Sequence, residues 1–151
     1  MKRNLTLCTT CESLKYFAIK FGTNGGALAG LSYATVSPSC TGSINAVQGS
    51  GFASRPGDNQ LYISTQLLDL SWVFESKLCP GRYIKATSPT TIGLLPGRSS
   101  DARFWVKHDA NHVHIQSAYH ASSYWRGGLP IKMDGYGTQY MVEYWPTQPW
   151  P

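Results

Sequence analysis

The sequence predicts an all-β domain, and its composition carries that prediction. The 151 residues include 15 Gly and 9 Pro, which favour tight turns, and 5 Trp, 9 Tyr and 5 Phe, which favour strands. Apolar residues at helical spacing are almost absent. A chain of this length forms one domain with its own core. We expect that domain over residues 15–145, between a short basic segment, 1–14, and an extended tail, 146–151, whose prolines exclude it from a central strand.

The first expected strand is KYFAIKF, residues 15–21. Phe17, Ile19 and Phe21 alternate in it with neighbours that point the other way, which is typical of a half-buried strand. Glycines interrupt residues 22–43, so only LSYATV within them fits a short strand.

The longest expected strand is LYISTQLLDLSWVF, residues 61–74. Its apolar residues change face near Gln66, and we interpret this change as a bulge or twist within one strand. A hairpin around residues 109–111 joins two of the later strands. These later strands are RYIKA (82–86), ARFWVKH (102–108), HVHIQ (112–116), LPIKM (129–133) and TQYMVEYW (138–145). The expected core residues are Leu68, Leu70, Trp72, Phe74, Phe104, Val106, Val113 and Ile115.

The charge of the chain favours a polyanionic partner only weakly. Thirteen Lys and Arg oppose eight Asp and Glu, giving a net charge of +5 without strong clustering. The most basic part is the N-terminus, and its cations are the expected nucleic-acid-facing residues, which would bind phosphates weakly and without sequence preference. They are Lys2, Arg3, Lys15 and Lys20. The sequence has no convincing signal peptide and no apolar run of about 20 residues, so we expect cytosolic synthesis and no membrane insertion.

The cysteines leave a zinc site, a redox pair or free thiols open. Cys8 and Cys11 form a CxxC pair, whereas Cys40 and Cys79 are isolated, and no second CxxC completes a zinc site. We therefore favour four thiols over a bound metal.

A second metal-like group lies in the hairpin around residues 109–111. It contains His108, Asp109, His112 and His114, of which the last two share a face if they lie on a strand. The competing interpretation, which we prefer, is a polar strand face opposite a buried one. The sequence also lacks the GxSxG, HExxH and phosphate-loop motifs. We expect no enzyme activity, no catalytic residue, no metal and no cofactor.

The aromatic segment AYHASSYWRGG, residues 118–128, has two interpretations. Aromatic rings beside an arginine stack on sugars or bases. Trp, Tyr and Arg are also enriched where subunits meet, and we prefer this second interpretation. The expected interface residues are Tyr124, Trp125, Arg126, Trp145 and Trp150.

The order of these segments resembles the single jelly-roll capsid proteins of small icosahedral viruses. The likeness begins at KYFAIKF and continues through Ile44, Gln48-Gly49-Ser50-Gly51 and the Arg55-x-Gly57-Asp58 group. RFWVKHD, GLPIKMDGYG and TQYMVEYW are similar to later strands of that family. The resemblance implies an antiparallel jelly roll that assembles into a shell, with sixty copies in the simplest icosahedral case, around a nucleic-acid genome in a virion.

The same resemblance implies a structural corner before the long strand. Such a corner reverses the chain tightly, so its glycines are expected to have positive φ, and Arg55 and Asp58 are expected to tie it to a neighbouring segment. The corner residues are Gln48, Gly49, Gly51, Arg55, Gly57 and Asp58.

A second resemblance leaves another fold and function open. The run from ARFWVKH through VHIQSAY to YW is similar to a segment of amaranthin-type agglutinin domains. This likeness implies a carbohydrate-binding lectin with a β-trefoil or β-sandwich fold, which also suits the many aromatic residues and the low charge. No internal repeat of 40–50 residues is visible in support of a trefoil, so the capsid jelly roll is the preferred prediction.

Overall fold

A computed structural model describes residues 16–21, 32–51, 55–109, 112–126, 128, 130–135 and 142–145. Within these residues the helical elements are two 3₁₀ turns, η4 (Asp58–Gln60) and η5 (Ser100–Ala102), and no helix among them has the length and apolarity to cross a membrane. All other regular elements are antiparallel strands. They are β1 (Tyr16–Phe21), β2 (Ser32–Thr35), β3 (Asn45–Gln48), β4 (Tyr62–Gln66), β5 (Trp72–Ser76), β6 (Arg82–Ala86), β7 (Ile92–Pro96), β8 (Phe104–Asp109), β9 (His112–Ser117), β10 (Tyr124–Arg126), β11 (Lys132–Asp134) and β12 (Val142–Trp145).

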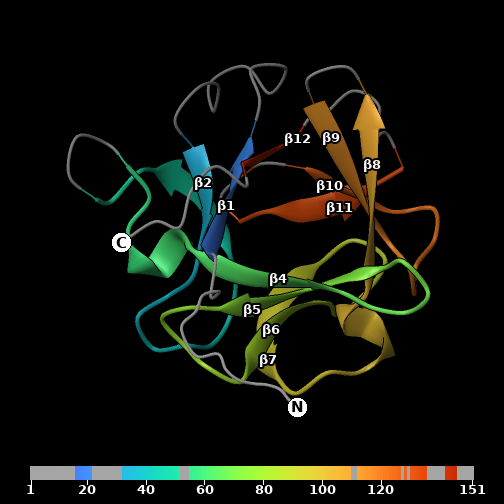
Figure 1. The fold of residues 1–151 in the computed structure, drawn as a ribbon, viewed down its shortest axis with the longest axis horizontal. Coiled ribbons are helices and arrows are strands. Elements are labelled where there is room, and N and C mark those ends of the chain that lie inside the picture. The colour runs from blue at the N-terminus through green and yellow to red at the C-terminus, as the bar shows by residue number, and fades with distance from the viewer. Residues whose placement is uncertain are drawn as a thin grey trace, which may run out of the picture.

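Half of these strands close into a ring. β1 pairs with β4, β4 with β5, β5 with β8, β8 with β9, β9 with β12, and β12 returns to β1. The other strands form three hairpins, β2–β3, β6–β7 and β10–β11, attached to β1, β5 and β9 respectively. Figure 1 shows the blue, the green-to-yellow and the orange strands in three sectors of the molecule. A closed ring has no free edges, which removes the usual site of strand-to-strand aggregation.

The chain is therefore built from three lobes of four strands each: lobe 1 is β1–β4, lobe 2 is β5–β8 and lobe 3 is β9–β12. Their first strands share one burial pattern, in which two buried residues precede a half-buried one and a further buried one. The second residue of this pattern is Ile19, Phe74 or Ile115, and each of the three is fully buried. The repeat is thus a repeat of burial and pairing rather than of residue identity.

The three hairpins contact one another in a cycle. The Leu94 N–H donates to the Gly42 carbonyl oxygen at 3.2 Å, and the Met133 N–H donates to that of Thr90 at 2.9 Å. The Ala46 N–H closes the cycle by donating to the Gly128 carbonyl oxygen at 2.9 Å. Each hairpin is thereby fixed by the next one.

Three aromatic side chains pack together between the ring strands β5 and β8 and the hairpin strand β10. Phe74, Phe104 and Trp125 are completely buried, with ring centres 5.2–6.0 Å apart and mostly tilted or edge-to-face contacts. Such pairs contribute about 0.5–1.5 kcal/mol each beyond the burial of their surface. These contacts contradict the expectation that Trp125 lies in a subunit interface, because no part of its side chain reaches the surface.

The expected jelly roll is wrong, whereas the all-β class is confirmed. A jelly roll is a pair of Greek-key sheets. Here the sheet closes on itself, and each hairpin pairs with one strand of the ring. Alternating strands and a glycine-rich corner occur in both architectures, so the order of these segments along the chain did not separate them. The spacing of the repeat is also uneven, because β1, β5 and β9 begin at residues 16, 72 and 112.

The predicted long strand over residues 61–74 is a hairpin of β4 and β5. The Asp69 carboxylate accepts hydrogen bonds from the Ser71 N–H and hydroxyl group, and Arg103 pairs with it at 2.7 Å. These bonds, those from Ser71 first, lower the pKa of Asp69. Leu70 adopts a left-handed φ of 73° and completes the turn. The change of face near Gln66 therefore marks a turn and not a bulge.

Some of the predicted core residues are buried, and others are exposed at the β4–β5 turn. Phe74, Phe104 and Ile115 are confirmed as fully buried, and Trp72 and Val106 pack against the core while partly exposed. Leu68 and Leu70 were wrongly placed in the core, since both are exposed at the β4–β5 turn. The side chain of Val113 lies outside the described part of the structure.

A buried glutamine organises the predicted corner. The Gln60 side-chain oxygen accepts hydrogen bonds from the N–H groups of Ser50 (2.8 Å) and Gly57 (3.0 Å). Its amide nitrogen donates to the Thr35 hydroxyl group and the Gln48 carbonyl oxygen, both at 2.9 Å. One side chain thus joins β2, the end of β3 and the start of η4.

The corner glycines serve close packing and not a left-handed backbone. Gly57 has a φ of −89°, and a Cβ atom there would lie 2.2 Å from the Ser50 hydroxyl oxygen. A Cβ atom on Gly51 would lie 2.9 Å from the Arg55 carbonyl oxygen. The expected positive φ at Gly49, Gly51 and Gly57 is wrong. Among the described glycines, positive φ occurs at Gly42, Gly81 and Gly97.

Cys40 and Cys79 form a disulfide, which contradicts the expectation of free thiols at these positions. It joins the β2–β3 connection in lobe 1 to the β5–β6 connection in lobe 2 across 39 residues of sequence. Disulfides are typical of proteins that fold in an oxidising compartment. Cys8 and Cys11 lie outside the described residues.

Candidate functional site

Four side chains form a row across neighbouring strands of lobe 3 and β8. Trp105 on β8 lies opposite Gln116 on β9, Gln116 lies opposite Tyr124 on β10, and Tyr124 lies opposite Asp134 on β11. All four are half-buried, whereas the residues that alternate with them, such as Phe104, point into the core. This Trp–Gln–Tyr–Asp row therefore occupies the outer face of the sheet.

The spacing of the row suits a flat ligand. Neighbouring strands lie about 4.8 Å apart, so the two aromatic side chains are separated by about 10 Å, with Gln116 between them. Aromatic rings present apolar faces, while a glutamine amide such as that of Gln116 can donate and accept hydrogen bonds and a carboxylate such as that of Asp134 can accept them. The arrangement offers both kinds of contact within one surface.

The loop beside the row is fixed by side chains of β9. The Gln116 amide donates to the Ala121 carbonyl oxygen. The Ser117 hydroxyl oxygen accepts the N–H groups of Tyr119 (3.1 Å) and His120 (2.8 Å), whose rings meet edge to face. These bonds hold Tyr119, which is 58% exposed, at the margin of the row.

Three exposed cations border the row. The Lys107 ammonium lies 5.8 Å from the centre of the Tyr124 ring, at the outer limit of a cation–π contact. Arg126 lies directly opposite Lys132 on the β10–β11 hairpin, and its guanidinium is 3.6 Å from the Asp134 carboxylate. The surface around Tyr124 therefore carries more positive than negative charge.

The equivalent rows of the other two lobes lack this chemistry. In lobe 2 the row contains Ile63, Glu75, Tyr83 and Leu95. Tyr83 is only 9% exposed, and the Arg98 guanidinium packs over its ring at 5.5 Å.

The row of lobe 1 is more apolar at its hairpin. It contains Glu143, Lys20, Tyr33 and Val47. Tyr33 is buried among Ala18 and Leu61. Of the three equivalent tyrosines, Tyr124 alone keeps a half-exposed ring with a carboxylate directly opposite on the hairpin.

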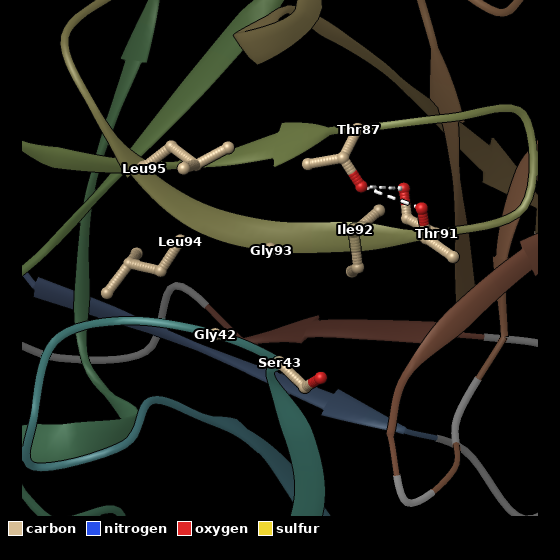
Figure 2. A pocket seen from close by; sticks show the side chains of 8 residues that line it. All are labelled: Gly42, Ser43, Thr87, Thr91, Ile92, Gly93, Leu94 and Leu95. Carbon is tan, nitrogen blue, oxygen red and sulfur yellow. Dashed lines mark hydrogen bonds between the residues drawn. The ribbon is translucent and has the colours of Figure 1, made fainter.

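A cavity of about 260 Å³ between two hairpins is the competing site. Figure 2 shows Gly42 and Ser43 running opposite β7, with the Thr87 and Thr91 hydroxyl groups joined at 2.7 Å above them. Gly93 permits this approach, because a Cβ atom there would lie 3.3 Å from the Gly42 carbonyl oxygen. None of the described residues that line the cavity has a charged or aromatic side chain. It lacks the groups that orient a polar ligand, so the Trp–Gln–Tyr–Asp row is the stronger candidate.

The structure separates the residues predicted for a subunit interface. Tyr124 lies in the row, Arg126 borders it, and Trp125 belongs to the core. Trp145 ends β12, and Trp150 lies outside the described residues.

Of the predicted nucleic-acid-facing residues, Lys20 is the one that lies within the described part of the chain. Lys20 is half-buried on β1, opposite Glu143 on β12. Lys2, Arg3 and Lys15 lie outside the described residues. In the predicted corner, Asp58 pairs with Lys77 at 3.0 Å, and Arg55 is exposed.

The histidine hairpin is present, with Asp109 opposite His112 and His108 opposite Val113. His114, however, is buried, and within the described part of the chain no group of three or more His, Cys, Asp or Glu is placed to hold a metal ion.

The sequence prediction missed three residues that complete the site: Trp105, Gln116 and Asp134. A usable signal was present, because the ARFWVKH–HVHIQ hairpin was predicted and its register places Trp105 opposite Gln116. Tyr124 lies opposite both Gln116 and Asp134, and these two pairings involve strands outside the predicted hairpin. They could therefore be found only from the fold.

No known protein family and no curated protein matches the sequence. Solved structures do match over most of the chain. SeviL bound to the asialo-GM1 saccharide has a TM-score of 0.64 at 8% identity, covering 86% of this chain and 97% of SeviL. The ricin B-like lectin of Macrolepiota procera in complex with lactose has a TM-score of 0.61 at 13% identity, with coverage of 90% and 98%. The designed 3-fold symmetric protein ThreeFoil has a TM-score of 0.63 at 14% identity, with coverage of 86% and 97%.

The fold is a β-trefoil. The threefold arrangement of ring strands and hairpins agrees with these likenesses, and it is the alternative fold that the sequence left open. The expected membership of the capsid jelly rolls is wrong, because the matching proteins are β-trefoils and not viral shell proteins. With it, the sequence-based support for a virion protein that encloses a genome is lost.

Proposed function

We propose that the protein binds carbohydrate through the Trp–Gln–Tyr–Asp row. The observation that carries this proposal is the alignment of two aromatic rings, an amide and a carboxylate on one outer face. Aromatic rings stack against the C–H faces of sugar rings, and planar polar groups hydrogen-bond to the hydroxyl groups at their edges. SeviL and the Macrolepiota lectin, which share the fold, were solved with saccharides bound.

The row is also supported rigidly enough to act as a preformed site. Trp125, which neighbours Tyr124 on β10, is anchored in the core against Phe74 and Phe104. The register of β10 is fixed on both sides, by Gln116 and by Asp134. Preformed sites lose less entropy on binding, so a shallow surface gains affinity from this support.

The test is binding to an array of diverse glycans, followed by calorimetry of the best ligand with two row variants. Tyr124→Ala removes the stacking surface and is expected to weaken binding about tenfold or more, since roughly 1.4 kcal/mol corresponds to a factor of ten. Tyr124→Phe keeps the ring and is expected to stay within a few-fold of the wild type.

The matched control is Leu95→Ala, which changes an exposed residue at the equivalent of Asp134 in lobe 2. It is expected to leave both binding and the unfolding temperature nearly unchanged. Absence of binding to every glycan, or equal affinity of Tyr124→Ala and the wild type, would overturn the proposal.

A further inference from the structure

The cations around the row are arranged in a way that a neutral ligand does not explain. Arg126 and Lys132 lie directly opposite each other on neighbouring strands, and both are exposed. Like charges in this arrangement destabilise a hairpin. One carboxylate, Asp134, lies beside them, with its oxygen 3.6 Å from Arg126. The pair together with this carboxylate retains one net positive charge.

Lys107 adds a further positive charge from the other side of Tyr124. It lies on β8 two residues beyond Trp105, on the same face of the sheet, and its ammonium approaches the Tyr124 ring. The cations thus lie on both sides of the β10 strand that carries Tyr124. Among the described residues of this face, three cations against one carboxylate leave a charge of +2.

The excess charge is not a property of the fold, because the other lobes do not repeat it. The position of Arg126 is occupied by Lys85 in lobe 2 and by Thr35 in lobe 1. Lys85 is buried, and its ammonium donates to the Pro96 carbonyl oxygen and the Ser99 hydroxyl group at 2.8 Å each.

The equivalents of Lys132 and Lys107 are uncharged. The position of Lys132 is taken by Gly93 and Asn45, and that of Lys107 in lobe 2 by Thr65. The three exposed cations therefore border the row that also carries the half-exposed Tyr124 ring and the Asp134 carboxylate. This coincidence of charge and stacking surface points to a ligand with both features.

We propose that the saccharide bound at the row is acidic, carrying a carboxylate or sulfate group that Arg126, Lys132 and Lys107 recognise. This inference rests on the proposed carbohydrate binding and specifies its ligand class. The sugar ring lies against Tyr124 and Trp105, while the anion takes a place beside the Arg126–Lys132 pair and relieves their repulsion. Arginine binds planar carboxylates, and tetrahedral oxyanions such as sulfate, through paired N–H donors, and lysine adds a point charge.

The experiment compares ligands that differ only in charge or in one acidic group. We use digalacturonate against its uncharged dimethyl ester, and lactose against 3′-sialyllactose and lactose 3′-sulfate, in calorimetry at low and high salt. At least one acidic ligand is expected to bind about tenfold tighter than its neutral partner. The preference is expected to fall as salt screens the exposed charges. The carboxylated and sulfated probes distinguish the two sources of the anion.

Two charge variants with equal loss of net charge provide the control. Lys132→Gln is expected to reduce the preference for the acidic ligand by about threefold or more, since one of three cations is lost. Arg55→Gln removes a charge from the exposed corner before η4, away from the row, and is expected to leave the preference unchanged.

The outcomes separate this inference from the proposed function. Binding of neutral glycans that needs Tyr124, without any gain from an acidic group, would overturn the inference and leave the proposed function standing. Failure of every saccharide together with tight, Lys132-dependent binding of a single-stranded oligonucleotide would overturn both. Equal effects of Lys132→Gln and Arg55→Gln would also overturn the inference, because net charge alone would then account for the preference.

Discussion

At the residue scale, Leu68 and Leu70 show why hydrophobicity alone does not locate a side chain. Both sit in an apolar run that favours burial, yet both project from the β4–β5 turn into solvent. Asp69 between them decides the outcome, because its carboxylate accepts two hydrogen bonds from Ser71 and pairs with Arg103. A short polar side chain that bonds to the backbone two residues ahead favours a turn over a strand.

Leu70→Gly is expected to stabilise the protein. A non-glycine residue in the left-handed region destabilises the folded state by about 1–2 kcal/mol, and Leu70 has this conformation. Glycine removes this strain, but its greater flexibility in the unfolded chain offsets about 0.5–1 kcal/mol of the gain. The net rise in the free energy of unfolding is about 0.5–1 kcal/mol, measured by urea denaturation. Leu68→Gly is the control, because Leu68 is exposed without a left-handed backbone, and it is expected to lower stability slightly. A loss of stability in Leu70→Gly would contradict the prediction.

At the scale of elements, the connection from β3 to β4 is held by side chains rather than by a strand ladder. Gln60 joins three segments through its amide, and Ser50 fills the space that a side chain on Gly57 would need. The glycine spacing predicted a tight corner here, and within the described residues Gln48, Ser50 and Gly57 do meet at the Gln60 side chain. The predicted reason for glycine at position 57 was wrong. Glycine is required there because Ser50 packs closely against the backbone, and not because φ is positive.

Gly57→Ala is expected to destabilise the protein by about 1–3 kcal/mol, the usual cost of overpacking. The new Cβ atom would lie 2.2 Å from the Ser50 hydroxyl oxygen, so the cost depends on Ser50. Ser50→Ala alone costs about 1 kcal/mol for its lost hydrogen bonds. The double variant is expected to lose less than the sum of the two single losses, measured as a double-mutant cycle in urea. Strict additivity would show that the two residues do not meet.

At the scale of the whole molecule, the lobes are joined by the closed ring, by the cycle of hairpins and by a disulfide between described residues. The Cys40–Cys79 disulfide connects lobe 1 to lobe 2, two residues before the segment at which Gly42 bonds to Leu94. It therefore restrains both the unfolded chain and the contact between the first two hairpins.

Replacing both cysteines, as Cys40→Ala with Cys79→Ala, is expected to lower the free energy of unfolding by about 3–4 kcal/mol, as loop-closure entropy predicts for 39 residues. Thermal and urea denaturation measure the loss. A reductant is expected to bring the wild type close to the double variant and to leave the variant itself unchanged. Equal stability of the reduced and oxidised wild type would contradict a stabilising disulfide.

Alternation and turn residues act over a few neighbouring positions, so they were enough to predict the all-β class, most strand positions and the β8–β9 hairpin. The sequence also singled out the aromatic segment that contains Tyr124, for which a subunit interface was preferred over a surface that stacks on sugars or bases. Three features could be seen only in the folded chain: the strands close into a ring, Trp125 is core while Tyr124 is surface, and Trp105, Gln116 and Asp134 join Tyr124 in one row. They depend on pairing between distant strands, which in turn depends on how all three lobes share one core. The three lobes fill that core with different residues, so the threefold repeat is present in burial and strand pairing but not in residue identity.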